Sequence, residues 1–230
     1  MFNLNRKEAR LVVLQRIELI NTFIKKIRKL FGRYIFSNII SRFFLKPDIV
    51  GKAYYDNMIE EFKTIETYID KKNKNILSIG GGLGGLELII NQKFDVDSFC
   101  FIERNYVSQK VKYGWDSRNK EAYNNLDLQK KFLIRNGMSL SKFNIFDYDK
   151  DQLPNKTFDI IVSLFSLDYH YDFNIYLDYL KKNSHDDTKI IFDTVRPDYF
   201  KNIFKIVNVI GKRNQAVHTS SRVVCSNFLN

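Results

Sequence analysis

The chain has 230 residues, of which 44% are hydrophobic, so it is long enough for one well-buried domain with an appendage and too short for two full domains. Its formal net charge is +11, but residues 1–46 hold eleven Lys or Arg and two acids, which gives this segment +9 and leaves +2 for the rest of the chain. A nearly neutral remainder argues against a core that binds nucleic acid across a basic face.

The N-terminal segment, residues 1–46, has apolar residues at helical spacing and basic residues throughout, which predicts two basic amphipathic helices with a break near Asn21 or Gly32. Its apolar runs are shorter than the roughly 20 residues that a membrane span requires. The segment either lies on an anionic membrane surface or forms a helical cover or dimer face packed on the core. An RNA-binding extension is a third alternative. We expect a domain boundary between this extension and residues 47–230.

After a helical stretch within residues 48–72, an apolar run over residues 76–90 is interrupted by five glycines among six residues and then resumes. The simplest prediction is a strand, a tight glycine turn and a helix. Glycine lacks a Cβ atom and tolerates positive φ angles, so a turn of this composition lets a ligand approach the backbone closely.

The turn fits two kinds of ligand. The spacing of Gly80, Gly82 and Gly85 satisfies the dinucleotide fingerprint, in which the helix N-terminus faces a pyrophosphate. The spacing of Gly80, Gly82 and Gly84 satisfies the looser pattern of S-adenosylmethionine enzymes. Both patterns expect an acidic residue at the end of the next strand to bind the ribose, and Glu103 closes the next apolar run.

Strands and helices alternate through most of the remaining chain, which predicts an α/β protein whose parallel sheet has helices on both faces. After an irregular aromatic stretch, the expected elements are a helix over 126–135, strands over 142–148 and 158–164, a helix over 174–182 and a strand over 189–195. Two strands, 204–210 and 220–228, end the chain with only a polar turn, 211–219, between them. A link that short predicts an antiparallel hairpin.

Both cysteines, Cys100 and Cys225, lie in apolar strand-like runs and not at a metal-ligand or disulfide spacing. This pattern indicates buried thiols in a reducing compartment. We therefore expect a cytoplasmic protein, with peripheral contact at the inner membrane face through residues 1–46 as the alternative.

Four features in this order resemble the class I S-adenosylmethionine-dependent methyltransferases over roughly residues 54–228. They are the motif Ile79-Gly80-x-Gly82-x-Gly84, the strand-ending Glu103, the run Asp149-x-x-x-Leu153-Pro154 to Ser163, and the terminal hairpin ending in Cys225. The resemblance implies a Rossmann-like, doubly wound, mostly parallel seven-stranded sheet with an antiparallel C-terminal hairpin. It also implies S-adenosylmethionine as cofactor, and the similarity extends to bacterial sugar O-methyltransferases.

The resemblance implies that the glycines lie beneath the methionine part of the cofactor, that Glu103 binds the ribose and that an acid after the third strand meets the adenine. Spacing to Leu153-Pro154 favours Asp149 for that acid, although Asp147 faces the same side of the strand. The residue two before the first glycine is usually acidic and here is Ser78, which removes one polar contact near the cofactor's amino group. The candidate cofactor-binding residues are Gly80, Gly81, Gly82, Gly84, Glu103, Asp147, Asp149 and Ser163.

Methyl transfer to a hydroxyl requires a base, and in open parallel sheets ligands bind at the carboxyl ends of the strands. His170 follows the fourth strand and is the candidate general base, because an imidazole accepts a proton near neutral pH. Asp168 is the candidate to orient it. The competing interpretation is that Asp168 caps the following helix and His170 is an ordinary loop residue. The candidate acceptor-binding residues are Tyr113, Trp115, Tyr169 and Tyr171.

Three alternatives to a metal-independent methyltransferase are a Mg²⁺ site, a dehydrogenase and a non-catalytic scaffold. Asp193, at the end of the fifth strand, would lie beside Asp168, so Mg²⁺ is an alternative that we do not favour, because carboxylates at strand ends more often cap helices. A dehydrogenase is disfavoured because the only Tyr-x-x-x-Lys, Tyr106 to Lys110, follows the second strand. The change at Ser78 would suit a non-catalytic scaffold subunit. The expected partners are a small-molecule or glycan acceptor and, as an alternative, a second copy of the chain.

Overall fold

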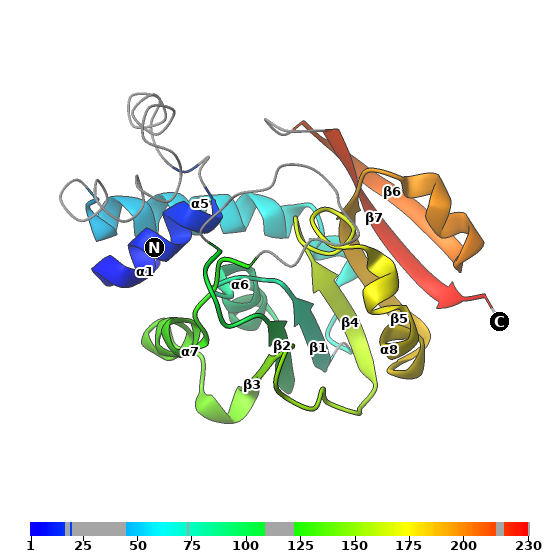
Figure 1. Cartoon of the computed structure of the whole chain (residues 1–230), viewed down its shortest axis with the longest axis horizontal. Coiled ribbons are helices and arrows are strands. Elements are labelled where there is room, and N and C mark those ends of the chain that lie inside the picture. The colour runs from blue at the N-terminus through cyan, green and yellow to red at the C-terminus, as the bar shows by residue number, and fades with distance from the viewer. Residues whose placement is uncertain (17–18, 20–44, 73, 109–121, 215–218, 230) are drawn as a thin grey trace.

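The computed structural model describes residues 1–16, 19, 45–72, 74–108, 122–214 and 219–229. Its centre is a seven-stranded sheet with the strand order β3-β2-β1-β4-β5-β7-β6 (Figure 1). The strands are β1 (Asn75–Ile79), β2 (Ser98–Glu103), β3 (Phe143–Asp147), β4 (Phe158–Ser163), β5 (Ser184–Thr194), β6 (Phe204–Asn214) and β7 (Thr219–Phe228). The first five strands are parallel to one another, and β7 pairs antiparallel with both β5 and β6. The predicted doubly wound sheet with a C-terminal antiparallel hairpin is confirmed.

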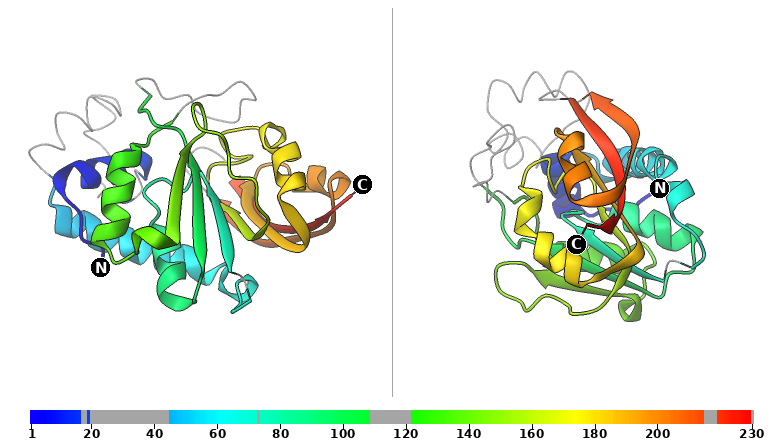
Figure 2. Two further views of the ribbon diagram at one scale, coloured as in Figure 1. Left: turned by 90° about the horizontal axis from the view of Figure 1, so that it is seen from below. Right: turned by 90° about the vertical axis from the view of Figure 1, so that its right-hand side faces the viewer.

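Helices cover both faces of this sheet (Figure 2). The described helices are α1 (Arg6–Gln15), α5 (Pro47–Lys63), α6 (Gly85–Lys93), α7 (Leu126–Arg135) and α8 (Leu177–Lys182), with 3₁₀ turns η3 (Glu66–Tyr68), η4 (Leu140–Lys142), η5 (Phe173–Ile175) and η6 (Pro197–Asn202). One apolar core joins the first four helices to one face of the sheet, and a second joins α8, η5 and η6 to the other face. The parallel strands read as continuous apolar runs because each is covered on both sides. Cys100 and Cys225 are buried free thiols, as predicted.

The first helix, α1, packs into the same core as the sheet. Asn5 and Glu8 form a capping box at its start, which satisfies two backbone N–H groups that would otherwise lack partners. Its apolar residues, Leu11 to Leu14, are all buried. The described part of residues 1–46 is thus a helical cover on the core. The second predicted helix falls on 20–44, outside the described residues, so membrane contact there and the domain boundary stay predictions.

None of the helices that the structure describes is long and apolar enough to cross a membrane.

The boundaries of two strands differ from the prediction. β5 begins at Ser184 and not at Lys189, because its polar first residues extend the pairing back to Phe158 of β4. β6 continues to Asn214, so the predicted polar turn 211–219 was too long. The hairpin has a bulge between Val209 and Gly211 and then continues to Asn214 with its register shifted by one residue. Polar and basic residues suit these positions because β6 is an edge strand.

Candidate functional site

The glycine turn between β1 and α6 has the backbone geometry that its composition predicts. Gly80, Gly82 and Gly84 have φ angles of 66°, 67° and 85°, in the left-handed region that other residues rarely adopt. A Cβ atom on Gly80 would lie 1.9 Å from Oγ of Ser166, which follows β4. The turn is therefore held against the residues after β4, at the carboxyl edge of the sheet, where open parallel sheets bind ligands.

Substitution at Gly80 tests this close approach. We expect Gly80→Ala to lower the free energy of unfolding by about 2–3 kcal/mol, because it combines an unfavourable φ angle with a collision at Ser166. Urea denaturation measures the change. Gly137→Ala is the matched control, since Gly137 has a φ of 94° and no atom within 4 Å of its Cβ position, so only about 1 kcal/mol should be lost. Equal losses in the two variants would contradict the role of the Ser166 contact.

Glu103 ends β2 as predicted and turns its carboxylate toward the glycine turn. It is 6% exposed, and its Oε1 accepts a hydrogen bond of 2.8 Å from the backbone N–H of Gly82. Burial raises the pKa of Glu103 to about 8, and hydrogen bonds from Asn124 and Gly82 only partly oppose this rise. Near neutral pH the free protein therefore holds this carboxyl mostly in its protonated form.

A second carboxylate, Glu87, lies beside the turn and was not singled out from the sequence. It stands in the first turn of α6, is 1% exposed, and its Oε1 accepts a hydrogen bond of 2.6 Å from Ser78 Oγ. Burial raises its pKa as well. The available signal was an acid between Leu86 and Leu88 in an apolar helix, at a turn whose usual acid is replaced by Ser78.

The polar groups around the turn favour a cationic ligand over a pyrophosphate. A pyrophosphate at a helix N-terminus requires free backbone N–H groups. Those of Gly82 and Gly85 instead donate to Glu103 and to Tyr54 Oη, at 2.8 and 3.1 Å. The two buried carboxylates would also repel phosphate oxygens whenever they are ionised. Of the two ligand classes that the glycine spacing left open, the dinucleotide is thus the poorer fit.

Two further residues, Gln15 and Asn124, close over the turn. Gln15 ends α1, donates to the backbone oxygen of Tyr123 at 2.7 Å, and has its Oε1 2.7 Å from where a Cβ atom on Gly82 would lie. Asn124 donates to the carbonyl of Gly82 at 3.0 Å. The sequence gives no signal for either residue, because the contacts depend on how segments distant in the chain pack against the turn.

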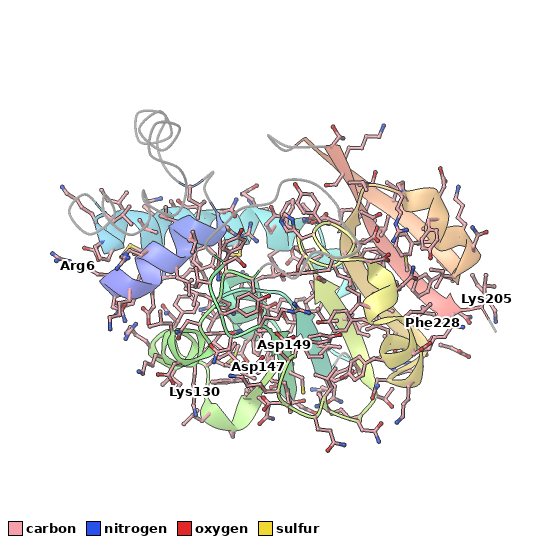
Figure 3. The ribbon with its side chains drawn as sticks, viewed as in Figure 1. Arg6, Lys130, Asp147, Asp149, Lys205 and Phe228 are labelled. Atoms are coloured by element: carbon pink, nitrogen blue, oxygen red, sulfur yellow. The ribbon has the colours of Figure 1, made fainter. Side chains whose placement is uncertain are left out.

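Asp147 and Asp149 lie at the end of β3, close to each other (Figure 3). Asp147 is paired in register with Glu103, is 6% exposed and accepts a hydrogen bond of 3.1 Å from the backbone N–H of Asp149. The Asp149 carboxylate is 3.7 Å from Nη2 of Arg104, whose guanidinium lies 4.9 Å from the ring centre of Tyr148. Both acids are thus on the expected side of Glu103, and the choice between them stays a prediction.

Ser163 binds the protein's own backbone. Its hydroxyl, in a residue that is 2% exposed, donates to the carbonyl of Ile79 at 2.7 Å and accepts from the N–H of Leu167 at 2.9 Å. These bonds tie the end of β4 to the end of β1 and fix the loop that follows. They give no support to the direct cofactor contact predicted for Ser163.

The hydrogen bonds that the described residues make to Asp168 come from residues other than His170, so they give no support to the predicted role of Asp168 in orienting His170. The fully buried carboxylate of Asp168 accepts hydrogen bonds from Thr194 Oγ1 at 2.5 Å and from Arg196 Nη2 at 2.6 Å. Thr194 is the last residue of β5, and Arg196 follows it. Asp168 also accepts a longer bond of 3.4 Å from the N–H of Phe173, which opens η5, while the N-cap of η5 is Asp172. His170 is half-buried at the carboxyl edge of the sheet, and its role as a base stays a prediction.

The carboxylates considered for Mg²⁺ are each paired with an arginine. Asp168 is held by Arg196, and Asp193 receives two hydrogen bonds of 2.9 Å from Arg222 and a third from the N–H of Phe165. A metal would have to displace both guanidinium groups. In the part of the chain that the structure describes, no group of three or more His, Cys, Asp or Glu could hold a metal ion.

The candidate acceptor-binding residues are partly placed. Tyr169 is 6% exposed, and its ring packs edge-on against Phe165 and His170, with centroid distances of 5.5 and 4.8 Å. Tyr171 is half-buried, with the guanidinium of Arg104 5.7 Å from its ring centre. Tyr113 and Trp115 lie outside the described residues.

Comparison with known proteins adds a family match. A family model described as "Methyltransferase domain" matches residues 52–222, from α5 into β7. No curated protein sequence matches the chain. Similar solved structures include the N-terminal domain of EvdMO1 with SAH bound (14% identity, 76% of this chain, 81% of that chain, TM-score 0.49). A second is precorrin-6y C5,15-methyltransferase from Geobacter metallireducens GS-15 (12% identity, 71% of this chain, 85% of that chain, TM-score 0.46). A third is the PH0226 protein from Pyrococcus horikoshii OT3 (13% identity, 75% of this chain, 91% of that chain, TM-score 0.46).

Proposed function

The chain belongs to the methyltransferase domain family, and from this premise we propose that it transfers a methyl group from S-adenosylmethionine to a hydroxyl group of a small or glycan-like acceptor. The observation that carries the proposal is the glycine turn with two buried carboxylates, Glu87 and Glu103, beside it. S-adenosylmethionine has a sulfonium and an ammonium group, and these positive charges would favour the ionised forms of the two acids when it binds. When bound, the sulfonium supplies an electrophilic methyl group.

The residues around the turn fit this cofactor in the assignment that the family resemblance suggested. The backbone of the glycine turn, which has positive φ angles at Gly80, Gly82 and Gly84, would lie beneath the methionine part. Glu103 would accept hydrogen bonds from the ribose hydroxyls. Asp147 or Asp149, next along the same edge of the sheet, would meet the adenine.

The acceptor is proposed to lie over the loop after β4. Methyl transfer is an in-line displacement, so the chain's main task is to align the reacting groups, and His170 would remove the hydroxyl proton. The half-buried ring of Tyr171 and the neighbouring Tyr169 support an acceptor with an apolar face, such as a sugar. Tyr113 and Trp115 are proposed to add to this surface.

A non-catalytic scaffold was the competing hypothesis, and its motive was the missing acid at Ser78. Glu87 answers this point, because its carboxyl group accepts a hydrogen bond from the Ser78 hydroxyl and so places an acid at the same part of the turn. The enzyme is therefore the better supported proposal.

Calorimetric titration tests the cofactor class directly. We expect S-adenosylhomocysteine, the product form of the cofactor, to bind the purified chain with a dissociation constant on the order of micromolar, and NADH to give no binding. The contrast arises because NADH brings a pyrophosphate to N–H groups that are already bonded. Binding of NADH without binding of S-adenosylhomocysteine would reverse the proposal, and binding of neither would favour the scaffold.

A further inference from the structure

Glu87 is a buried carboxylate that has only part of the partners it needs. One oxygen accepts from Ser78, while Oε2 is buried and has no hydrogen-bond partner among the residues that the structure describes. Buried polar atoms in native proteins are nearly always paired, and a buried charge without a partner is strongly unfavourable. The free protein accommodates this group by favouring its neutral form. A partner that comes with a ligand would complete the site.

The position of this carboxylate points to the glycine turn. A Cβ atom on Gly81, in the middle of the turn, would lie 2.4 Å from Ser78 Oγ and 2.9 Å from Glu87 Oε1. Glu87 therefore lies directly behind the backbone of the turn. Any ligand that approaches this backbone comes within range of the charge.

Within the described residues, one arginine is the cation that acts on an ionised Glu87. This arginine is Arg16, whose guanidinium also donates to Asn57 at 3.2 Å and lies 5.5 Å from the ring centre of Phe165. Glu103, on the next strand, is a second carboxylate that the charge of Glu87 disfavours. Each acid thus disfavours the ionised form of the other, so an added positive charge would be stabilised at this place.

We propose that Glu87 supplies the negative charge that holds the amino group of the cofactor's methionine part. This inference rests on the proposed function and adds to it a residue on α6. The charge that related turns carry on the strand, two residues before the first glycine, is here supplied from the helix through the hydrogen bond between Glu87 and Ser78.

The competing explanation is that Glu87 only stabilises the start of α6. An acid in the first turn of a helix interacts favourably with the helix dipole. In that case its neutralisation would weaken the fold and would affect every ligand of the turn to the same extent. The two explanations therefore differ in which ligands respond.

Glu87→Gln removes the charge and retains the shape of the side chain. We expect binding of S-adenosylhomocysteine, which carries the amino group, to weaken about tenfold to thirtyfold. Binding of 5′-methylthioadenosine, which has the adenosine and thioether but no amino-acid part, should change less than twofold. Equal losses for the two ligands, or no loss for the first, would overturn the inference. Failure of the wild type to bind either ligand would instead remove the proposed function itself.

Two controls make the outcome specific. Glu60→Gln changes an exposed acid of α5 that pairs with Lys63 at 2.7 Å, and should leave both affinities unchanged. The charge can also be moved across the 2.6 Å contact: Ser78→Asp/Glu87→Gln should bind S-adenosylhomocysteine at least tenfold more tightly than its neutral counterpart, Ser78→Asn/Glu87→Gln. No difference between the two members of this pair would overturn the inference. If variants with Glu87→Gln fail to fold, the wild type decides: it should bind S-adenosylhomocysteine at least tenfold more tightly than 5′-methylthioadenosine, and equal affinities would overturn the inference.

Discussion

Replacing Arg222 by alanine is expected to lower the free energy of unfolding by about 3–5 kcal/mol. Arg222 lies in β7 with a completely buried side chain. Its guanidinium donates to Asp193 of β5 through two nitrogens at 2.9 Å, and to Glu61 and Thr64 at 2.6 Å each. Truncation would take the guanidinium away from the buried carboxylates of Asp193 and Glu61 and would remove this link between α5 and the hairpin edge of the sheet.

Chemical denaturation measures this loss of stability, and two further variants show whether it comes from the buried ion pairs. Lys212→Ala, at an exposed position of the same hairpin, should change stability by less than about 0.5 kcal/mol. Adding Glu61→Gln and Asp193→Asn to Arg222→Ala should restore part of the loss, because the two buried charges that face Arg222 are then removed with it. A change below about 1 kcal/mol in Arg222→Ala would show that the ion pairs do not hold these elements together.

The sheet was predictable because its strands carry strong local signals. The apolar runs that end at Ile79 and Glu103 are bounded by turn residues, and the short link before β7 allowed only an antiparallel return. The error at the hairpin has a local cause, since Gly211 and the polar residues after it read as a turn. Gly211 to Asn214 are in fact paired residues of β6, an edge strand with a strand neighbour on one side only.

The site was predictable only where one residue's place followed from its own strand. Glu103 is such a case, because the end of β2 must meet the turn after β1. The partner of Asp168 is not, because Arg196 lies 28 residues away and reaches it from the end of the neighbouring strand. Gln15 was not predicted for the same reason, because it approaches the turn from the first helix, which is distant in the sequence. Pairing between loops depends on tertiary packing, which spacing in the sequence does not encode.

Replacing Glu103 by alanine is expected to weaken binding of S-adenosylhomocysteine about 100-fold, or roughly 3 kcal/mol. The carboxylate is proposed to accept hydrogen bonds from the ribose, and each such bond to a charged acceptor is stronger than a neutral one. Calorimetry measures the loss, with Glu60→Gln as the exposed control. Affinity within threefold of the wild type would exclude Glu103 from the cofactor site.

The pH dependence of this binding follows from the pKa of Glu103, which burial raises to about 8. Below that pH the free protein holds a neutral carboxyl, while the ribose hydroxyls favour the ionised acceptor, so binding releases a proton. The affinity of the wild type should therefore rise by up to about tenfold per pH unit from pH 6 to 8 and then level off. Glu103→Gln should bind more weakly and lose this part of the pH dependence.

The stability of the free protein should change with pH in the opposite sense. A carboxyl whose pKa rises from 4.5 to about 8 on folding binds its proton more tightly in the folded state. Its contribution to stability is complete below pH 4.5 and falls by up to about 1.4 kcal/mol per pH unit as the pH approaches 8. Glu103→Gln should thus become more stable than the wild type at pH 8 in chemical denaturation. If instead both proteins lose the same stability between pH 5 and 8, another group titrates, and the buried carboxyl of Glu103 is not what couples proton binding to this site.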